Sequence, residues 1–268
     1  MTRFERDTAV EAAGAPGVWV GRCDDGWFTP RGPNGGYIAA IVLRAMLAEL
    51  RTQGAEDRAA RSLSLHYLRS PVAGPLEVRV TVERSGRSLS SLSARLEQDG
   101  RLCVLALGAF SVDFTSLAAY AEPPPAVPPP GASAVLPPRP GGDVPSMFQR
   151  VVLEPVVGAP AFSGADEALT GGWISFADGP QALDAPALAQ IADVWLPTAW
   201  VRLTEFIPAP TVDLTIHFRS PGTVVADPVL GVFRSRYARD GFFEEDGEVW
   251  SADGTLLAQS RQLALLTR

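Results

Sequence analysis

The sequence predicts an α+β protein made of two tandem copies of one domain. Three observations lead to this prediction: a motif that occurs twice, a helix followed by four strands in each half, and a proline-rich stretch between the halves. The motif is LHYLRSP at residues 65–71, and it reappears as TIHFRSP at residues 215–221. An aspartate–glycine turn also repeats, at Asp99 and Asp253. Self-similarity of this kind indicates a duplicated structural unit.

The first copy is predicted to hold one long helix and an antiparallel sheet. Gly35 and Gly36 open a segment with apolar residues at helical spacing as far as Leu50. A short strand is expected before it, near residues 26–28. Four segments with strand-like alternation follow, at residues 62–69, 75–84, 89–98 and 102–112.

The connection between the copies is predicted at residues 119–145. This stretch includes PPP at residues 123–125 and PPRPGG at residues 137–142, a composition typical of an extended, semi-rigid connector. We therefore expect an N-terminal repeat over residues 1–118 and a C-terminal repeat over residues 146–268.

The second copy repeats the order of elements. A strand at residues 173–176 precedes an apolar helical segment that begins near Ala185 and is stopped by Pro197. Four strands are expected after it, at residues 211–219, 228–237, 243–251 and 255–266. A sheet that wraps a central helix is the hotdog arrangement, and two such units in one chain can pair internally to cover their exposed edges. The predicted fold is a double hotdog, and we expect homo-oligomers through its sheet or helix faces.

Composition excludes several classes of function. The net charge is -7 and no basic run occurs, which argues against a nucleic-acid partner. The chain contains no lysine, so Schiff-base lysine chemistry is excluded. Cys23 and Cys103 are isolated, which favours a reducing cytosol, and no segment has the length of a membrane span. A cytoplasmic location is expected.

One carboxylate stands out within the second helical segment. Asp193 lies in the apolar run IADVWLP, at residues 191–197. An unpaired buried carboxylate is unfavourable by several kcal/mol unless it is hydrogen-bonded or its pKa shifts. We interpret Asp193 as a functional residue; the alternative is a helix residue that faces water.

Taken together, these motifs resemble the acyl-CoA thioesterase II family of double-hotdog thioesterases. The resemblance rests on GGYIAA at residues 35–40, the two RSP strand ends, Ala192-Asp193 followed by Leu196-Pro197, TVD at residues 211–213, and Gln262 eight residues after Gly254. It implies a role in fatty acid metabolism and an acyl-CoA substrate, with no cofactor and no metal. It also implies a water molecule oriented by Asp193, Thr211 and Gln262, all in the C-terminal repeat.

Thioester chemistry is compatible with this set. The leaving thiol has a pKa of about 8.5, so it can depart as a thiolate with little acid assistance. One base and an oxyanion site suffice. Asp193 can accept a proton from water while Thr211 and Gln262 hold that water, and the backbone N–H groups of Gly36 and Tyr37 are candidate oxyanion donors at a helix start.

The repeat provides an internal comparison. The offset between the copies is 150 residues at the first motif and 154 at the aspartate–glycine turn. At these offsets Asp193, Thr211 and Gln262 fall opposite Leu43, Arg61 and Gly108. The first copy therefore lacks the polar set, which predicts one active site per chain.

Strand alternation orients two of the three residues. Gln262 shares a strand face with Ala258, Ser260 and Ala264, which is the less polar face and is expected to point inward. Thr211 alternates with Asp213 and Thr215 and is expected to point outward, unless a bulge turns it.

Other reaction types have less support. His66 and His217 are the only histidines, which leaves little material for a metal site or a serine triad. Asp213 and His217 offer an acid and a base for a hotdog enoyl-CoA hydratase, but four residues along a strand separate them by about 13 Å. A non-catalytic protein that binds acyl-CoA or fatty-acyl groups is the remaining alternative.

Overall fold

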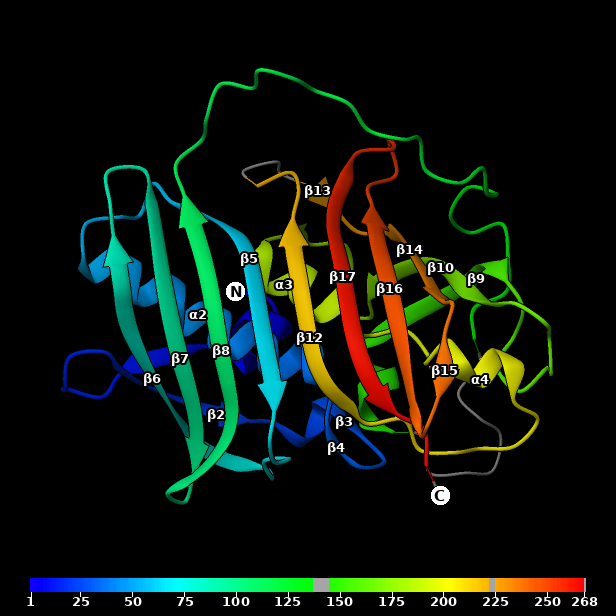
Figure 1. Cartoon of the computed structure of the whole chain (residues 1–268), viewed down its shortest axis with the longest axis horizontal. Coiled ribbons are helices and arrows are strands. Elements are labelled where there is room, and N and C mark those ends of the chain that lie inside the picture. The colour runs from blue at the N-terminus through cyan, green and yellow to red at the C-terminus, as the bar shows by residue number, and fades with distance from the viewer. Residues whose placement is uncertain (137–144, 222–224, 268) are drawn as a thin grey trace.

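The computed structural model describes residues 1–136, 145–221 and 225–267, so PPRPGG at residues 137–142 of the expected connector lies outside the described residues. It confirms a double hotdog with a long helix behind a large antiparallel sheet (Figure 1). No helix among the described residues is both long and apolar enough to cross a membrane.

The N-terminal elements cover residues 3–111. The long helix α2 (Gly35–Thr52) is the expected one, and it starts at the N-cap residue Asn34, whose side chain accepts from the N–H of Tyr37. The strands are β1 (Val10–Ala12), β2 (Val18–Cys23), β3 (Phe28–Thr29), β4 (Gly32–Pro33), β5 (Ala59–Tyr67), β6 (Gly74–Ser85), β7 (Leu89–Gln98) and β8 (Arg101–Ser111). A short helix α1 (Arg3–Asp7) precedes them.

The C-terminal elements cover residues 146–265. Its helices are α3 (Ala185–Ile191) and α4 (Ala199–Arg202), after a 3-10 turn at Ser146–Gln149. Its strands are β9 (Val151–Gly158), β10 (Ala168–Phe176), β11 (Ala182–Leu183), β12 (Thr211–Phe218), β13 (Val225–Ala226), β14 (Val229–Ser235), β15 (Ala238–Arg239), β16 (Phe242–Trp250) and β17 (Leu256–Leu265).

Two expectations about local structure were wrong. The strand expected near residues 26–28 is a 3-10 helix, Asp25–Trp27, because the side chain of Asp24 accepts from the N–H of Gly26 and closes a turn. A two-residue strand, β3, begins only at Phe28 and pairs with β4, and the strand of the large sheet that precedes α2 is β2. The second helical segment does not reach Pro197, since α3 ends at Ile191.

A single sheet joins the two repeats. Its strand order is β1-β2-β6-β7-β8-β5-β12-β17-β16-β14-β10-β9, with β15 paired to β16. The seam is β5 against β12, so the two strands that carry the repeated motif pair antiparallel with each other. Leu65 faces Leu214 and Leu63 faces Ile216 across this seam. Figure 1 shows β5 and β12 side by side in the middle of the molecule.

The helices lie behind the seam and pack against each other. The apolar face of α2 contributes Ile38, Ile41 and Val42, each at most 2% exposed, to one core cluster that also includes Ala189 and Ile191 of α3. The two helices approach closely at Gly36, where an added Cβ would lie 2.7 Å from the carbonyl oxygen of Ala189. Glycine is therefore needed there, and the start of α2 lies against the end of α3.

The described part of the connector is attached to the second repeat. Residues 112–136 contain no helix or strand. The N–H groups of Gly131 and Ser133 donate to the carboxylate of Glu154 on β9, at 2.8 and 2.7 Å. The carbonyl of Pro128 accepts from the indole of Trp173 on β10 at 2.9 Å.

Candidate active site

Asp193 lies in a tight turn directly after α3. Its N–H donates to the carbonyl of Gln190 at 3.2 Å, and that of Val194 donates to Ile191 at 3.4 Å, so the last helical turn narrows to 3-10 geometry. Ile191 and Val194 are buried while Asp193 is partly exposed. The carboxylate thus leaves the helix end pointing toward the start of α2.

The start of α2 holds this carboxylate. The N–H of Gly36 donates to Asp193 Oδ2 at 2.8 Å, and Asn34 Nδ2 donates to the same oxygen at 3.2 Å. Asn34 Nδ2 also donates to the backbone carbonyl of Asp193 at 2.7 Å. A Cβ on Gly35 would lie 2.8 Å from Oδ2, so the close approach of the acid requires glycine at that position.

The environment of Asp193 changes its acidity. Burial raises its pKa from 3.8 to about 7, and the N–H of Gly36 opposes part of that rise. The negative charge of Glu245 raises the pKa further. The positive end of the helix dipole also lies at this N-terminus, where it favours the ionised form. A carboxyl group with a pKa near 7 can exchange protons at neutral pH.

Thr211 and Gln262 form a second polar group with Glu245. The Thr211 hydroxyl donates to Gln262 Oε1 at 2.8 Å, and Gln262 Nε2 donates to Glu245 Oε1 at 2.7 Å. The other carboxylate oxygen of Glu245 accepts from the N–H of Thr198 at 2.7 Å. Gln262 and Glu245 are 9% and 4% exposed, and burial raises the pKa of Glu245.

A bulge determines the direction of Thr211. In the pairing of β12 with β17 the register shifts between Thr211 and Asp213, so Leu214 is opposite Gln262 while Thr211 is opposite Ala264. The extra residue reverses the alternation at the strand start. Thr211 therefore turns to Gln262, and the outward orientation expected from simple alternation was wrong. The inward orientation of Gln262 is confirmed by its burial.

The two groups lie close but do not touch. Among the described residues no hydrogen bond joins Asp193 to Thr211 or Gln262. Strand β17 passes beside the turn, since the hydroxyl of Ser260 donates to the carbonyl of Ala192 at 3.5 Å. The effect of Glu245 on the pKa of Asp193 also indicates proximity. The base and the amide chain therefore lie on neighbouring elements, the turn after α3 and strand β17.

The two candidate oxyanion donors are already engaged. The N–H of Gly36 is bound to Asp193, and the N–H of Tyr37 donates to Asn34 Oδ1 at 3.0 Å. The Tyr37 side chain is fully buried and stacks on Trp27 with 5.5 Å between ring centroids. A substrate oxygen could use either N–H group only by displacing its present acceptor.

The equivalent positions of the first repeat have packing roles. Leu43 is fully buried in α2. Arg61 donates to Ser111 and forms an ion pair with Asp113. A Cβ on Gly108 would lie 2.8 Å from the ring of Phe110 and 3.0 Å from the sulfur of Met46, so apolar side chains occupy the space that Gln262 takes in the second repeat.

Three residues of this region were not anticipated from the sequence. Asn34 precedes the glycine pair, a typical N-cap position that could have been recognised. Glu245 alternates with the buried residues Phe243 and Val249, so an inward acid was readable from the strand pattern. Tyr67 was noted only as part of the repeated motif. Its hydroxyl donates to the carbonyl of Gly35 at 2.8 Å. Burial raises the pKa of Tyr67, and the negative charge of Asp193 raises it further.

Comparisons with known families cover most of the chain. A model of the acyl-CoA thioesterase N-terminal domain matches residues 24–111, and a model of the acyl-CoA thioesterase C-terminal domain matches residues 121–266. No curated protein matches the chain.

Solved structures of similar fold span the whole chain. A hot dog protein of unknown function from Alicyclobacillus acidocaldarius has a TM-score of 0.89 at 26% identity, covering 100% of this chain and 99% of that one. A candidate thioesterase II from Thermobifida fusca has a TM-score of 0.85 at 28% identity, with 100% and 98% covered. An acyl-CoA thioesterase II from Mycobacterium marinum shares the fold, with a TM-score of 0.77 at 20% identity and 98% of each chain covered.

Proposed function

Because the chain belongs to the acyl-CoA thioesterase family and is a thioester hydrolase, we propose that it cleaves acyl-CoA by direct attack of one water molecule. Asp193 acts as the general base, and Thr211 with Gln262 orients the water. No covalent enzyme intermediate is required, since water itself supplies the oxygen that replaces the thiol.

The observation that carries this proposal is the position of Asp193. Its carboxylate lies at the N-terminus of an 18-residue helix, partly exposed, with a pKa of about 7. A general base is most effective when its pKa lies near the working pH. Both Gly36 and Asn34 donate to Oδ2, and we assign the other oxygen, Oδ1, to the water.

The hydrogen bonds between Thr211 and Gln262 support a defined water orientation. Thr211 uses its only hydroxyl proton on Gln262 Oε1, so toward the site it can only accept. Gln262 uses one N–H on Glu245 and keeps a second N–H to donate. A water that donates to Thr211 and accepts from Gln262 has its remaining proton for Asp193.

Hydrolysis then proceeds by attack of the water and release of the thiol. The water proton passes to Asp193 Oδ1 while the water oxygen bonds to the thioester carbon. The tetrahedral species collapses, the C–S bond breaks, and the thiolate of coenzyme A leaves with the electron pair. Asp193 returns its proton to the thiolate or to solvent.

The oxyanion is assigned to the start of α2. Once Asp193 is protonated it becomes a weaker hydrogen-bond acceptor. The Gly36 N–H is then available to the negative charge that develops on the carbonyl oxygen of the thioester. Tyr37 keeps its N–H on Asn34, so it contributes through the dipole of α2 and not through a direct bond.

Release of free thiol from a panel of acyl-CoA esters tests this function. We expect turnover by the wild-type chain and a loss of kcat of at least about 100-fold for Asp193→Asn, the usual contribution of a general base. Asp213→Asn, on the same strand as Thr211, is the matched control and is expected to keep its activity. Binding without thiol release, or an active Asp193→Asn, would reject the mechanism.

A further inference from the structure

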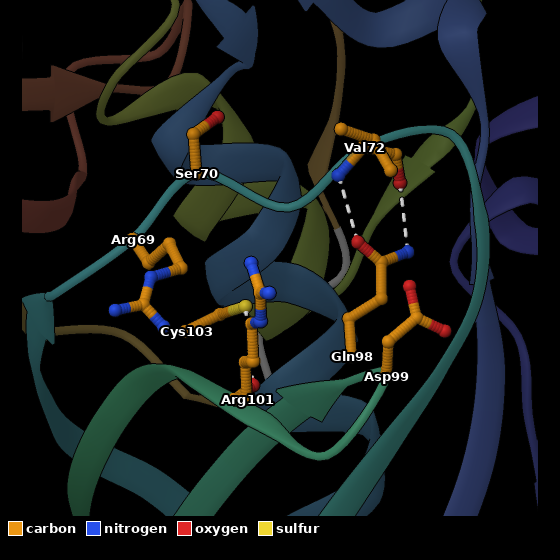
Figure 2. A pocket seen from close by; sticks show the side chains of 7 residues that line it. All are labelled: Arg69, Ser70, Val72, Gln98, Asp99, Arg101 and Cys103. Atoms are coloured by element: carbon orange, nitrogen blue, oxygen red, sulfur yellow. Dashed lines mark hydrogen bonds between the residues drawn. The ribbon is translucent and has the colours of Figure 1, made fainter.

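A pocket of about 320 Å³ lies beside the end of β5, outside the acid and amide groups described above. Figure 2 shows the side chains that line it, with Arg69 and Arg101 on either side of Cys103. We propose that this pocket binds the phosphate groups of coenzyme A. The proposal rests on the proposed function and names the part of the chain that holds the nucleotide end of that substrate.

The wall of the pocket is preformed. Gln98 is 9% exposed, and its amide binds the loop after β5 through three hydrogen bonds. Its Oε1 accepts from the N–H of Val72 at 2.8 Å, and its Nε2 donates to the carbonyls of Val72 and Pro75 at 2.9 and 3.1 Å. Figure 2 shows the two bonds to Val72. Little ordering is left for a ligand to impose.

The charges in the pocket suit an anion. Within the described residues the guanidinium groups of Arg69 and Arg101 have neither an ion pair nor a hydrogen bond, and both residues are exposed. Asp99 is the one acid of the lining. Burial raises the pKa of Cys103, so its thiol stays neutral. Two fixed positive groups against one acid leave a net positive site, and arginine binds phosphate through paired N–H groups.

The equivalent region of the second repeat, as far as the structure describes it, lacks a pair of arginines without hydrogen-bond partners. Arg219 corresponds to Arg69, but its Nε donates to Gln259 Oε1 at 2.8 Å. The position of Arg101 is taken by Thr255, and Asp253 is bound there by Ser251 and by the N–H of Thr255. The free pair of arginines thus belongs to the first repeat, while the base Asp193 belongs to the second.

The pocket lies near the reacting groups. The Tyr67 hydroxyl donates to the carbonyl of Gly35 at 2.8 Å, and a Cβ on Gly35 would lie 2.8 Å from Asp193 Oδ2. The Ser70 hydroxyl occupies the space that a Cβ on Gly32, just before α2, would take. The three residues from Tyr67 to Ser70 span at most ~10 Å. A thioester carbon beside Asp193 and phosphates beside Arg69 and Arg101 can therefore belong to one extended molecule.

Two substrates with the same acyl group test the proposal. The acyl-CoA carries the phosphates, and the acyl-N-acetylcysteamine thioester carries none. For the double variant Arg69→Gln/Arg101→Gln we expect kcat/KM with acyl-CoA to fall by roughly tenfold or more per arginine, as for a lost charged hydrogen bond. With the truncated thioester kcat/KM is expected to stay unchanged. Equal losses on both substrates, or no loss on either, would overturn the proposal.

Calorimetric titration separates this proposal from the catalytic one. Coenzyme A and adenosine 3′,5′-bisphosphate are expected to bind the wild-type chain and to bind the double variant more weakly, even if neither thioester is hydrolysed. Arg219→Gln is the matched control and should leave binding as in the wild type. Unchanged affinity of the double variant for these two ligands would overturn the assignment of the coenzyme A phosphates to this pocket. Inorganic phosphate that binds as tightly as coenzyme A would replace the assignment by a general phosphate site.

Discussion

Gln262 Nε2 lies 2.7 Å from Oε1 of the buried Glu245, and this contact decides which end of the amide meets Thr211. An ionised carboxylate can accept hydrogen bonds but cannot donate one, so it pairs with the amide N–H and leaves the amide oxygen to Thr211. Glu245→Gln can pair with either end of the amide and removes that preference. We expect kcat to fall by about tenfold or more while KM changes little.

A double variant separates a positioning role from general damage. If Glu245 acts through Gln262, then Glu245→Gln/Gln262→Ala should be no slower than Gln262→Ala alone. Losses that multiply in the double variant would show that Glu245 acts by another route. Thermal unfolding of each variant checks that the fold is retained.

Activity is expected to depend on pH through Asp193. Its pKa of about 7, raised chiefly by burial, means that the basic form becomes dominant only above neutrality. The rate constant kcat should therefore rise with pH, reach half its maximum near pH 7 and level off above it. Steady-state kinetics from pH 5 to 8.5, with spontaneous thioester hydrolysis subtracted, measure this profile. A midpoint near the ordinary carboxyl value of about 4 would contradict it.

The free energy of unfolding should decrease with rising pH through Asp193, whereas kcat should increase. Because the pKa of Asp193 is raised in the folded protein, the native state keeps its proton longer than the unfolded chain. The resulting stabilisation is complete below about pH 4 and is lost as the pH rises through about 7. Asp193→Asn removes this loss, so its Tm relative to the wild type should be higher at pH 8 than at pH 5. An equal difference at both values would speak against the burial of the charge.

Two substitutions of Thr211 distinguish the effect of its methyl group from that of its hydroxyl group. Thr211→Val keeps the shape but removes the hydroxyl that donates to Gln262 at 2.8 Å, whereas Thr211→Ser keeps the hydroxyl. We expect a drop in kcat of about fivefold to fiftyfold for valine and less for serine. The values of kcat for the two variants test this prediction. A serine variant as slow as the valine variant would indicate that only the contact of the methyl group is important.

Gly36 is predicted to be the most sensitive glycine of the helix start. A Cβ there would lie 2.7 and 2.8 Å from the carbonyl oxygens of Ala189 and Gln190. Gly36→Ala should force α2 and α3 apart and lower the free energy of unfolding by about 1–3 kcal/mol. The control is Gly86→Ala in the turn before β7, whose nearest contact is 3.4 Å. Denaturant unfolding compares the two, and equal effects would contradict the close helix approach.

Much of the fold could be predicted because the sequence patterns that indicate it are either local or occur twice. The helical spacing after Gly35 predicted α2, and the duplicated motif predicted two similar sheets. The end of the second helix was missed because the apolar residues on both sides of Asp193 continue as far as Leu196. The turn depends on contacts with Asn34 and Gly36, which lie far away in the sequence. Boundaries set by tertiary contacts leave no trace in local periodicity.

The candidate site was less readable than the fold. Gln262 follows from alternation within its own strand. Thr211 does not, because its bulge is a property of the pairing between β12 and β17 and exists only when both strands are present. Glu245 shows the intermediate case: its inward direction is local, but its contact with Gln262 belongs to the pairing of β16 with β17.

The seam of β5 and β12 allows a division of labour between the repeats. Where two identical subunits associate, every substitution appears on both sides of their axis. Here the partners are different stretches of one polypeptide, joined edge to edge by backbone hydrogen bonds. Leu43 and Asp193 could therefore diverge independently at related positions. Because the seam joins two different sequences, only one half has to carry the base while both halves keep the interface.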